Sequence, residues 1–247
     1  MFDLTGKRAL VTGSGQGIGL GIARHLAVQG AHVLVNDFYP DRAESAAGQL
    51  GGEGLSVEAR AFDVTDLDAV KAALDGEALD IVVNNAGNAG ASAMGTSPFR
   101  EMDPAQWAGP IDVNLHGVMN TTHATLPGMC ERGFGRLITI SSGAGSIGLP
   151  IGVSPYGAAK AAGMSFMRHM AIENARLGVT ANSVALGLME MTEITDEGLV
   201  ATLAKTVPKG RLGTGKDIGP AIVWLASDEA EWVTGQTIHV NGGGLTT

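Results

Sequence analysis

A short apolar run, a glycine-rich turn and a helical pattern follow one another at the start of the chain and constrain the fold most strongly. The run is Arg8–Thr12, the turn holds Gly13, Gly17 and Gly19, and the helical pattern covers 18–29. Such a turn lets the backbone approach a pyrophosphate while the amino end of the helix supplies N–H donors. An ordinary strand-to-helix turn has the same pattern. Because it follows an N-terminal strand, we favour a dinucleotide-binding unit.

Strand and helix patterns then alternate to the end of the chain. We expect further strands over 32–36, 56–62, 80–83, 136–140, 179–184 and 237–240, and helices over 41–50, 67–74, 104–132, 155–176 and 217–226. This alternation predicts a doubly wound parallel sheet with helices on both faces and a ligand beyond the carboxyl ends of the strands. The residues that follow predicted strands are Gly13, Asp37, Asp63, Asn85, Ser142 and Gly187.

Neither a repeat nor a linker divides the 247 residues, so we expect a single domain over 1–247. Gly109, Pro110 and Pro127 should bend or break the helix over 104–132. Residues 187–206 show no firm strand pattern and are expected to form a mobile substrate flap.

Charge and cysteine content exclude several classes of function. The net charge is −9 and no cluster of Lys and Arg appears, which argues against a nucleic-acid surface. Cys130 is the only cysteine and the six histidines show no H-E-x-x-H spacing, so neither a disulfide framework nor a zinc site is expected. Because no signal-peptide pattern or membrane-length apolar run is present, we expect a cytoplasmic protein.

Asp37 follows the second predicted strand at about the distance from Gly19 expected of the acid that binds an adenine ribose. Its carboxylate would accept hydrogen bonds from the ribose hydroxyls and repel a 2′-phosphate. A turn aspartate at a strand end is the structural alternative. Gln16, beside Gly17, and Asn36 and Phe38, beside Asp37, are uncharged, so the sequence predicts NAD rather than NADP.

Tyr156 and Lys160 are four residues apart in a predicted helix, so their side chains project from the same face. A free tyrosine has a pKa near ~10, and a neighbouring cation lowers it toward the range useful for proton transfer. The hydroxyl of Ser142 is able to hold a carbonyl or alcohol oxygen beside the phenol. Taken alone, the pair also fits a helix with an exposed Tyr and Lys.

Together these features resemble the short-chain dehydrogenase/reductase family over essentially the whole chain. The matching segments are Thr12-Gly13-x-x-x-Gly17-Ile18-Gly19, Asp63-Val64, Asn84-Asn85-Ala86-Gly87, Asn114, Ser142, Tyr156-x-x-x-Lys160 and Val240-Asn241-Gly242-Gly243. The resemblance implies a Rossmann-type fold, a nicotinamide cofactor and a homotetramer.

The resemblance also implies a role for each matching residue. Tyr156 would be the general acid/base, Lys160 would lower its pKa and bind the nicotinamide ribose, and Ser142 would orient the substrate. Asn114 would hold a water of a proton relay. The expected cofactor-binding residues are Gly13, Gln16, Gly17, Ile18, Gly19, Asp37, Asp63, Val64, Asn85, Ala86, Gly87, Tyr156, Lys160, Gly187 and Met189.

Three departures from the family pattern concern the cofactor clamp and the substrate site. Leu186 replaces the usual proline after strand six, and Met191 stands where a threonine often contacts the carboxamide. The segment from Ser142 to Tyr156 is one residue longer than usual. None of these departures removes an expected catalytic residue.

The sequence therefore predicts an NAD-dependent oxidoreductase acting on a secondary alcohol or ketone. Segments such as Gly210–Gly213 and Leu225–Ala230 are similar to those of 3-oxoacyl-thioester reductases, so a reductase of ACP or CoA thioesters is one alternative. A dinucleotide-binding regulator without turnover is the other.

Overall fold

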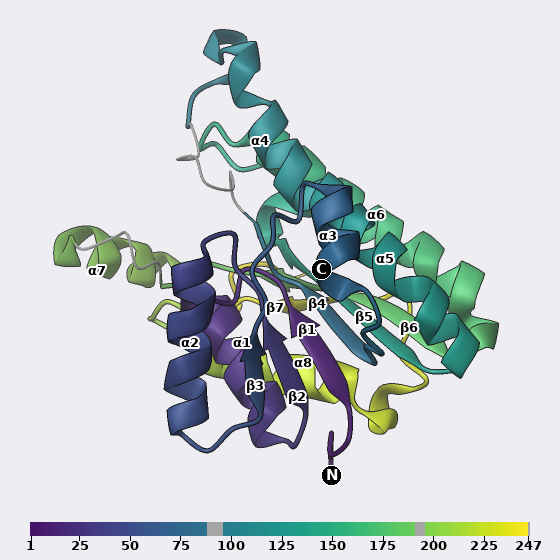
Figure 1. Cartoon of the computed structure of the whole chain (residues 1–247). Helices are drawn as coiled ribbons and strands as arrows, with labels where there is room; N and C mark the ends of the chain where they lie inside the picture. Colours follow the sequence, from purple (N-terminus) through teal and green to yellow (C-terminus); the bar gives the residue numbers. More distant parts are fainter. Residues whose placement is uncertain (88–95, 191–195, 247) are drawn as a thin grey trace.

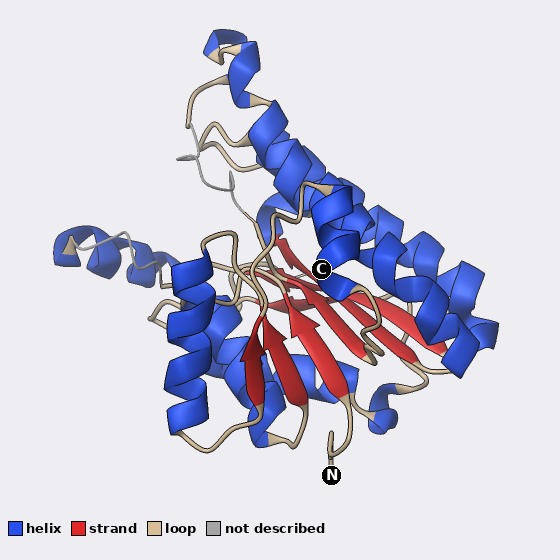
Figure 2. Cartoon of the chain, viewed as in Figure 1, coloured by secondary structure: helices blue, strands red, loops and turns tan. Residues whose placement is uncertain are grey.

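Seven parallel strands form the centre of the computed structural model, which describes residues 1–87, 96–190 and 196–246 (Figure 1). They lie in the order β3-β2-β1-β4-β5-β6-β7. Figure 2 shows the strands in the middle and helices on either side of them. The predicted doubly wound parallel sheet is confirmed.

The strands are β1 (Arg8–Val11), β2 (His32–Val35), β3 (Val57–Ala59), β4 (Ile81–Asn84), β5 (Gly135–Ser142), β6 (Val179–Leu186) and β7 (Thr237–Val240). The α-helices are α1 (Gly17–Val28), α2 (Pro40–Gly52), α3 (Leu67–Leu74), α4 (Ala108–Ile111), α5 (Gly117–Arg132), α6 (Ser154–Asn174), α7 (Glu197–Thr206) and α8 (Gly215–Ala226). Short turns η1 (Phe99–Glu101), η2 (Pro104–Gln106), η4 (Gly143–Gly145), η5 (Ala175–Leu177) and η6 (Asp228–Ala230) are 3₁₀, and η3 (Asp112–His116) is a π turn.

Alternate residues of the strands supply two apolar cores because successive side chains point to opposite faces of a sheet. On one face, Val11 and Val83 belong to the cluster that α1, α2 and α8 cover. On the other face, Leu10 and Val82 belong to the cluster that α3, α5 and α6 cover. Both faces are therefore buried, as the continuous apolar strands require.

The order of the strands reverses at β1, which pairs with β2 on one side and β4 on the other. Connections leave these strands toward opposite faces, so their carboxyl ends diverge and leave a crevice where such folds bind ligands. Thr12 and Asn85 flank this position, and the amide N–H of Asn85 donates to Thr12 Oγ1 at 3.0 Å.

The two interruptions predicted in the helix over 104–132 disturb it less than expected. Gly109 and Pro110 lie within α4, and the chain passes through the π turn directly into α5. Pro127 lies inside α5, which continues to Arg132. The region predicted as a flap contains a helix, α7, that the sequence analysis did not identify, whereas residues 191–195 lie outside the described part of the chain.

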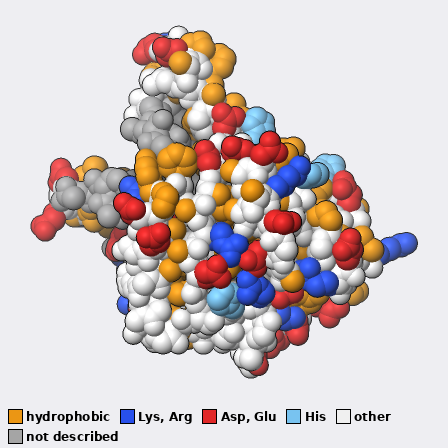
Figure 3. Space-filling model, in the orientation of Figure 1, with side chains coloured by type: hydrophobic (Ala, Val, Ile, Leu, Met, Phe, Trp, Pro, Cys, Tyr) orange, Lys and Arg blue, Asp and Glu red, His pale blue; other side chains and the backbone are white. Residues whose placement is uncertain are grey.

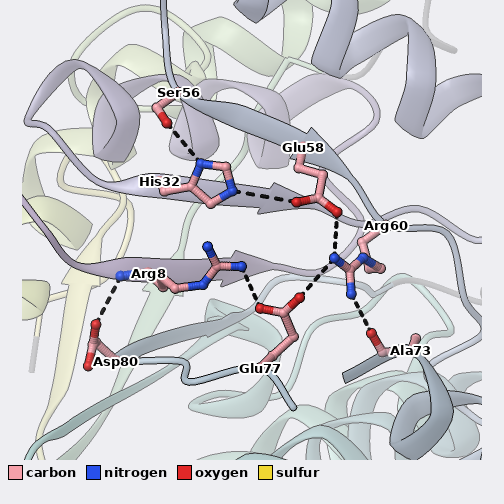
Figure 4. A network of polar contacts seen from close by, with 8 residues as sticks. All are labelled: Arg8, His32, Ser56, Glu58, Arg60, Ala73, Glu77 and Asp80. Atoms are coloured by element: carbon pink, nitrogen blue, oxygen red, sulfur yellow. Dashed lines mark hydrogen bonds and ion pairs between the residues drawn. The ribbon is translucent and has the colours of Figure 1, made fainter. Parts of the chain in front are cut away.

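Charged side chains link the edge of the sheet to the segment before β4 (Figure 4). Arg60 contacts Glu77 at 2.9 Å and also Glu58, while Arg8 pairs with Glu77. His32 lies 3.6 Å from Glu58. We call Arg8, His32, Glu58, Arg60 and Glu77 the edge network.

On the face shown in Figure 3, Lys and Arg are interspersed with Asp and Glu. Within the described ranges, no helix has the length and hydropathy needed to cross a bilayer. The same part of the chain contains no group of three or more His, Cys, Asp or Glu side chains placed to bind a metal ion.

Candidate active site

The glycine turn between β1 and α1 has conformations and contacts that require glycine. Gly13 and Gly17 have φ values of 60° and 57°, in the left-handed region that favours glycine. A β-carbon at Gly13 would lie 2.8 Å from Cα of Ala86, and one at Gly19 would lie 2.3 Å from the carbonyl oxygen of Gly13. No atom lies within 4 Å of the β-carbon position of Gly17, so the turn is open there. Gln16 is the N-cap residue of α1, and Ile18 packs on the core beneath the turn.

Asn36 fixes the end of β2 to the glycine turn. Its side chain accepts from the amide of Gly13 at 3.2 Å, and its carbonyl accepts from the amide of Ser14 at 2.7 Å. Its amide group donates to the carbonyls of Arg60 and Phe62. These bonds place Asp37, which is only 6% exposed, beside the turn.

The segments after β3 and β4 line the same crevice. Asp63 accepts from the amide and hydroxyl of Thr65, both at 2.8 Å, and Val64 is buried. The side chain of Asn85 donates to the carbonyls of Thr12 and Gly13 at 2.9 Å. Ala86 is in contact with the turn at Gly13, as described above, and its amide donates to Thr12 Oγ1. The structure thus holds the Asn85–Ala86 segment against the glycine turn.

Tyr156 and Lys160 lie one turn apart on α6, which begins with Ser154 and Pro155. Proline is favourable in the first turn of a helix because its missing N–H would have no partner there. Ser142, the last residue of β5, makes a side-chain hydrogen bond with Tyr156, and its hydroxyl oxygen accepts from the amide of Ala144 at 3.2 Å. The hydroxyl groups of Ser142 and Tyr156 therefore lie beside each other.

Lys160 is only 5% exposed and its ammonium group donates to the carbonyl of Ile140 at 2.7 Å. Its Nζ atom lies 5.8 Å from the centroid of the Tyr156 ring. Burial lowers the pKa of Lys160 to about 8, because the apolar surroundings disfavour the charged form.

The expectation that Lys160 lowers the pKa of Tyr156 does not hold in this structure. Burial raises the pKa of Tyr156, and the hydrogen bond with Ser142 opposes that rise. The spacing of the two residues is as predicted, but the sequence contains no sign that Lys160 would also donate to a backbone carbonyl.

Asn114 lies in the π turn and is fully buried, and its side-chain amide donates to the carbonyl of Pro110 at 2.7 Å. A β-carbon built on Gly87 would lie 3.1 Å from both Asn114 Oδ1 and Lys160 Nζ. Gly87 thus joins the β4 segment to the interior end of the predicted proton relay.

The end of β6 completes the crevice. A β-carbon at Gly187 would lie 2.8 Å from Cα of Asn241, so this position needs a small residue even though Leu186 replaces the proline before it. Met189 pairs with Gly213 and packs on the core. Met191, the second departure from the family pattern, lies outside the described residues.

Two structural contributors were missed as site residues. Thr12 and Asn36 hold the turn, β2 and β4 together, yet the sequence analysis treated them as a motif position and an uncharged neighbour. A polar residue at the end of an otherwise apolar strand is the signal that identifies such a clamp.

The crevice fits a dinucleotide, because it combines an open glycine turn at a helix amino end with a buried carboxylate after β2. The fold and these residues define an oxidoreductase that uses a nicotinamide dinucleotide.

The family model described as enoyl-(acyl carrier protein) reductase matches residues 13–245. The chain belongs to the short-chain dehydrogenase/reductase family and acts on CH–OH or ketone groups.

Relatives of known name support this membership over almost the whole chain. The 3-oxoacyl-(acyl-carrier-protein) reductase FabG of Haemophilus influenzae is 38% identical, covering 97% of this chain and 98% of its own. A gluconate 5-dehydrogenase from Burkholderia cenocepacia in complex with NADP and tartrate has a TM-score of 0.90 at 36% identity, covering 98% and 96%. A 3-oxoacyl-(acyl-carrier protein) reductase from Brucella melitensis with bound NAD has a TM-score of 0.91 at 34% identity, covering 99% and 94%.

Proposed function

We propose that this protein interconverts a secondary alcohol and a ketone with NAD, and that Tyr156 transfers the proton. The hydrogen bond between Ser142 and the half-buried Tyr156 carries this proposal. In that arrangement, a substrate oxygen that lies between the two hydroxyl groups is held by both of them.

When bound, the nicotinamide supplies or accepts the hydride. In the reducing direction, Tyr156 Oη donates its proton to the carbonyl oxygen as the C–H bond forms at the carbonyl carbon. In the oxidising direction, the same oxygen removes the proton of the alcohol. Ser142 orients the substrate oxygen in both directions.

Lys160 returns the proton to Tyr156 from the interior side of the site, and Asn114 holds the water that supplies Lys160 in turn. The low pKa of Lys160, about 8, allows it to exchange a proton near neutral pH, whereas an ordinary lysine remains charged. The position of Asn114 supports this role, because its Oδ1 atom and Lys160 Nζ each lie 3.1 Å from the same β-carbon position built on Gly87.

The choice of NAD rests on Asp37. Its carboxylate lies beside the glycine turn, where the adenine ribose is expected, and it would repel a 2′-phosphate. Both dinucleotides occur among the structural relatives, since one holds NADP and another NAD. Asp37 is therefore the residue on which we base the choice of NAD in this chain.

A reductase of 3-oxoacyl thioesters is the second candidate, favoured by the full-length similarity to FabG. A panel of substrates separates the candidates. It contains neutral cyclic ketones, their alcohols, gluconate, and a 3-oxoacyl thioester of CoA and of the short neutral carrier N-acetylcysteamine. Turnover is followed by nicotinamide absorbance with both dinucleotides. Activity restricted to thioesters would establish the second candidate, and binding of NADH with no turnover on any substrate would contradict both.

A cytoplasmic homotetramer is part of the proposal. A groove of about 410 Å³ runs between the segment after β5 and a face of α6 that carries Gly157, Ala158 and Ala161. The apolar side chains of Ile147 and Leu149, both partly exposed, also line it. Such a surface of small and apolar residues suits close packing of a second subunit. Light scattering at micromolar concentration tests it, and a 25 kDa-scale monomer would contradict it.

A further inference from the structure

The β-carbon position of Gly15 lies unusually close to the side chain of Asp37. A β-carbon built on Gly15 would be 2.6 Å from Oδ2 and 3.0 Å from Cγ of Asp37, and 2.9 Å from Cβ of Arg42. The backbone at Gly15 is not among the positive-φ glycines, so it would accept another residue. What excludes a side chain at this position is the space that Asp37 and α2 occupy.

The neighbours of Gly15 have little freedom to move away. Asp37 is buried, and its Oδ1 atom accepts from the amide of Tyr39 at 3.1 Å. Cβ of Arg42 is attached directly to the backbone of α2, and the Arg42 guanidinium lies over the Tyr39 ring at 4.5 Å. The bonds from Asn36 described above hold the turn and β2 together.

Gly15 also differs from the other glycines of the turn. Gly13 and Gly19 make room for backbone atoms, and Gly17 has a left-handed conformation. The group closest to the β-carbon position of Gly15 is instead a carboxylate, and it is the carboxylate on which the proposed choice of NAD rests.

We propose that Gly15 is a specificity-determining residue for the dinucleotide. Because it has no side chain, the Asp37 carboxylate lies against the turn, within reach of the adenine ribose hydroxyls. A β-carbon at position 15 displaces that carboxylate, which removes bonds to the ribose and reduces the repulsion of a 2′-phosphate. This inference rests on the proposed preference for NAD.

The test compares kcat/KM for NAD and NADP in Gly15→Ala, in Asp37→Ala and in the variant that carries both changes. Gly48→Ala is the matched control, because Gly48 lies in α2 with no atom within 4 Å of its β-carbon position. We expect Gly15→Ala to lower the NAD/NADP ratio about tenfold, mainly through NAD, as for a lost hydrogen bond to a buried polar group. Gly48→Ala should leave the ratio unchanged.

The double variant shows whether Gly15 acts through Asp37, since coupled residues give non-additive effects. With Asp37 already replaced by alanine, the added methyl group has no carboxylate to displace, so the ratio should change by less than about twofold. An equal fall in both backgrounds would overturn the inference. So would an unchanged ratio in Gly15→Ala when Asp37→Ala lowers it.

These outcomes are distinct from a failure of the proposed function, in which Asp37→Ala itself leaves the ratio unchanged. If Gly15→Ala does not yield folded protein, thermal unfolding of the double variant decides. Recovery to the Tm of Asp37→Ala supports displacement of the carboxylate, and a double variant that also fails to fold contradicts it.

Discussion

Charged side chains are arranged differently in the edge network and in the crevice at the carboxyl ends of the strands. In the edge network, Arg60 is placed between two carboxylates, and its partner Glu77 also binds Arg8. In the crevice, Lys160 binds a carbonyl oxygen and Asp37 binds a backbone amide. Charges that neutralise one another stabilise the fold locally, whereas charges held by the backbone keep their capacity to interact with a ligand.

Burial accentuates this difference. The Arg60 and Glu58 side chains are 23% and 47% exposed, so water screens their attraction. Lys160 is 5% exposed, and burial lowers its pKa to about 8. The edge network is therefore expected to affect stability slightly and catalysis not at all, while the buried groups affect catalysis at a cost in stability.

The largest expected effect is on turnover in Tyr156→Phe. This change removes the proton that Tyr156 transfers and alters little else, so kcat should fall by about 10²–10⁴-fold. NADH binding, followed by fluorescence, should persist. Tyr39→Phe is the control, because Tyr39 is the only other tyrosine and should not affect kcat. Normal turnover in Tyr156→Phe would remove this residue from the mechanism.

Replacing Lys160 should raise stability at neutral pH. Below pH 8 the folded protein carries a buried ammonium group, which costs roughly 3 kcal/mol relative to its ordinary pKa of 10.5. Lys160→Met should therefore increase the free energy of unfolding at pH 7 while lowering turnover less than Tyr156→Phe does.

The stability difference between Lys160→Met and the parent should shrink as pH rises. Between pH 8 and 10.5 the folded parent has lost the proton that its unfolded chain retains, so the parent gains stability with pH. Urea unfolding at several pH values measures this, with Lys71→Met, at an exposed lysine of α3, as the control. A pH-independent difference would show that the ammonium group is not the cause.

Asp37→Ala should reduce the NAD/NADP ratio of kcat/KM by about tenfold to a hundredfold, because it removes bonds to the ribose and relieves repulsion of a phosphate. Asp41→Ala, in the first turn of α2, is the control for a general loss of negative charge nearby. A parent enzyme that already prefers NADP would refute the reading of Asp37.

The smallest effect is expected in the edge network. Arg60→Gln should lower the free energy of unfolding by about 1 kcal/mol and leave kcat unchanged. The hydrogen bond from Arg60 lowers the pKa of Glu58 from 4.5, so its contribution is present above pH 4.5 and is lost below it. Arg24→Gln, which breaks the separate pair with Glu53, should cost less. A large loss of turnover in Arg60→Gln would mean that the two regions are coupled.

Local patterns in the sequence were sufficient to predict the succession of strands and helices along the chain and the parallel sheet. The alternation of apolar runs with helical patterns requires parallel strands, and their carboxyl ends then gather Gly13, Asp37, Asn85 and Ser142 on one edge. The family resemblance supplied roles for these residues that no spacing contains.

The tertiary structure alone decided the partners of the buried groups. Lys160 binds the carbonyl of Ile140, Gly87 separates Asn114 from Lys160, and Gly15 leaves space for Asp37. The contacts of Gly87 and Gly15 join residues from different strands and helices, and Lys160 reaches back from α6 to a carbonyl of β5. Their distances depend on how the helices pack on the sheet, which no local pattern encodes. Helix α7 was missed although its sequence carries a start signal, since Asp196 caps its amino end by accepting from the amides of Gly198 and Leu199.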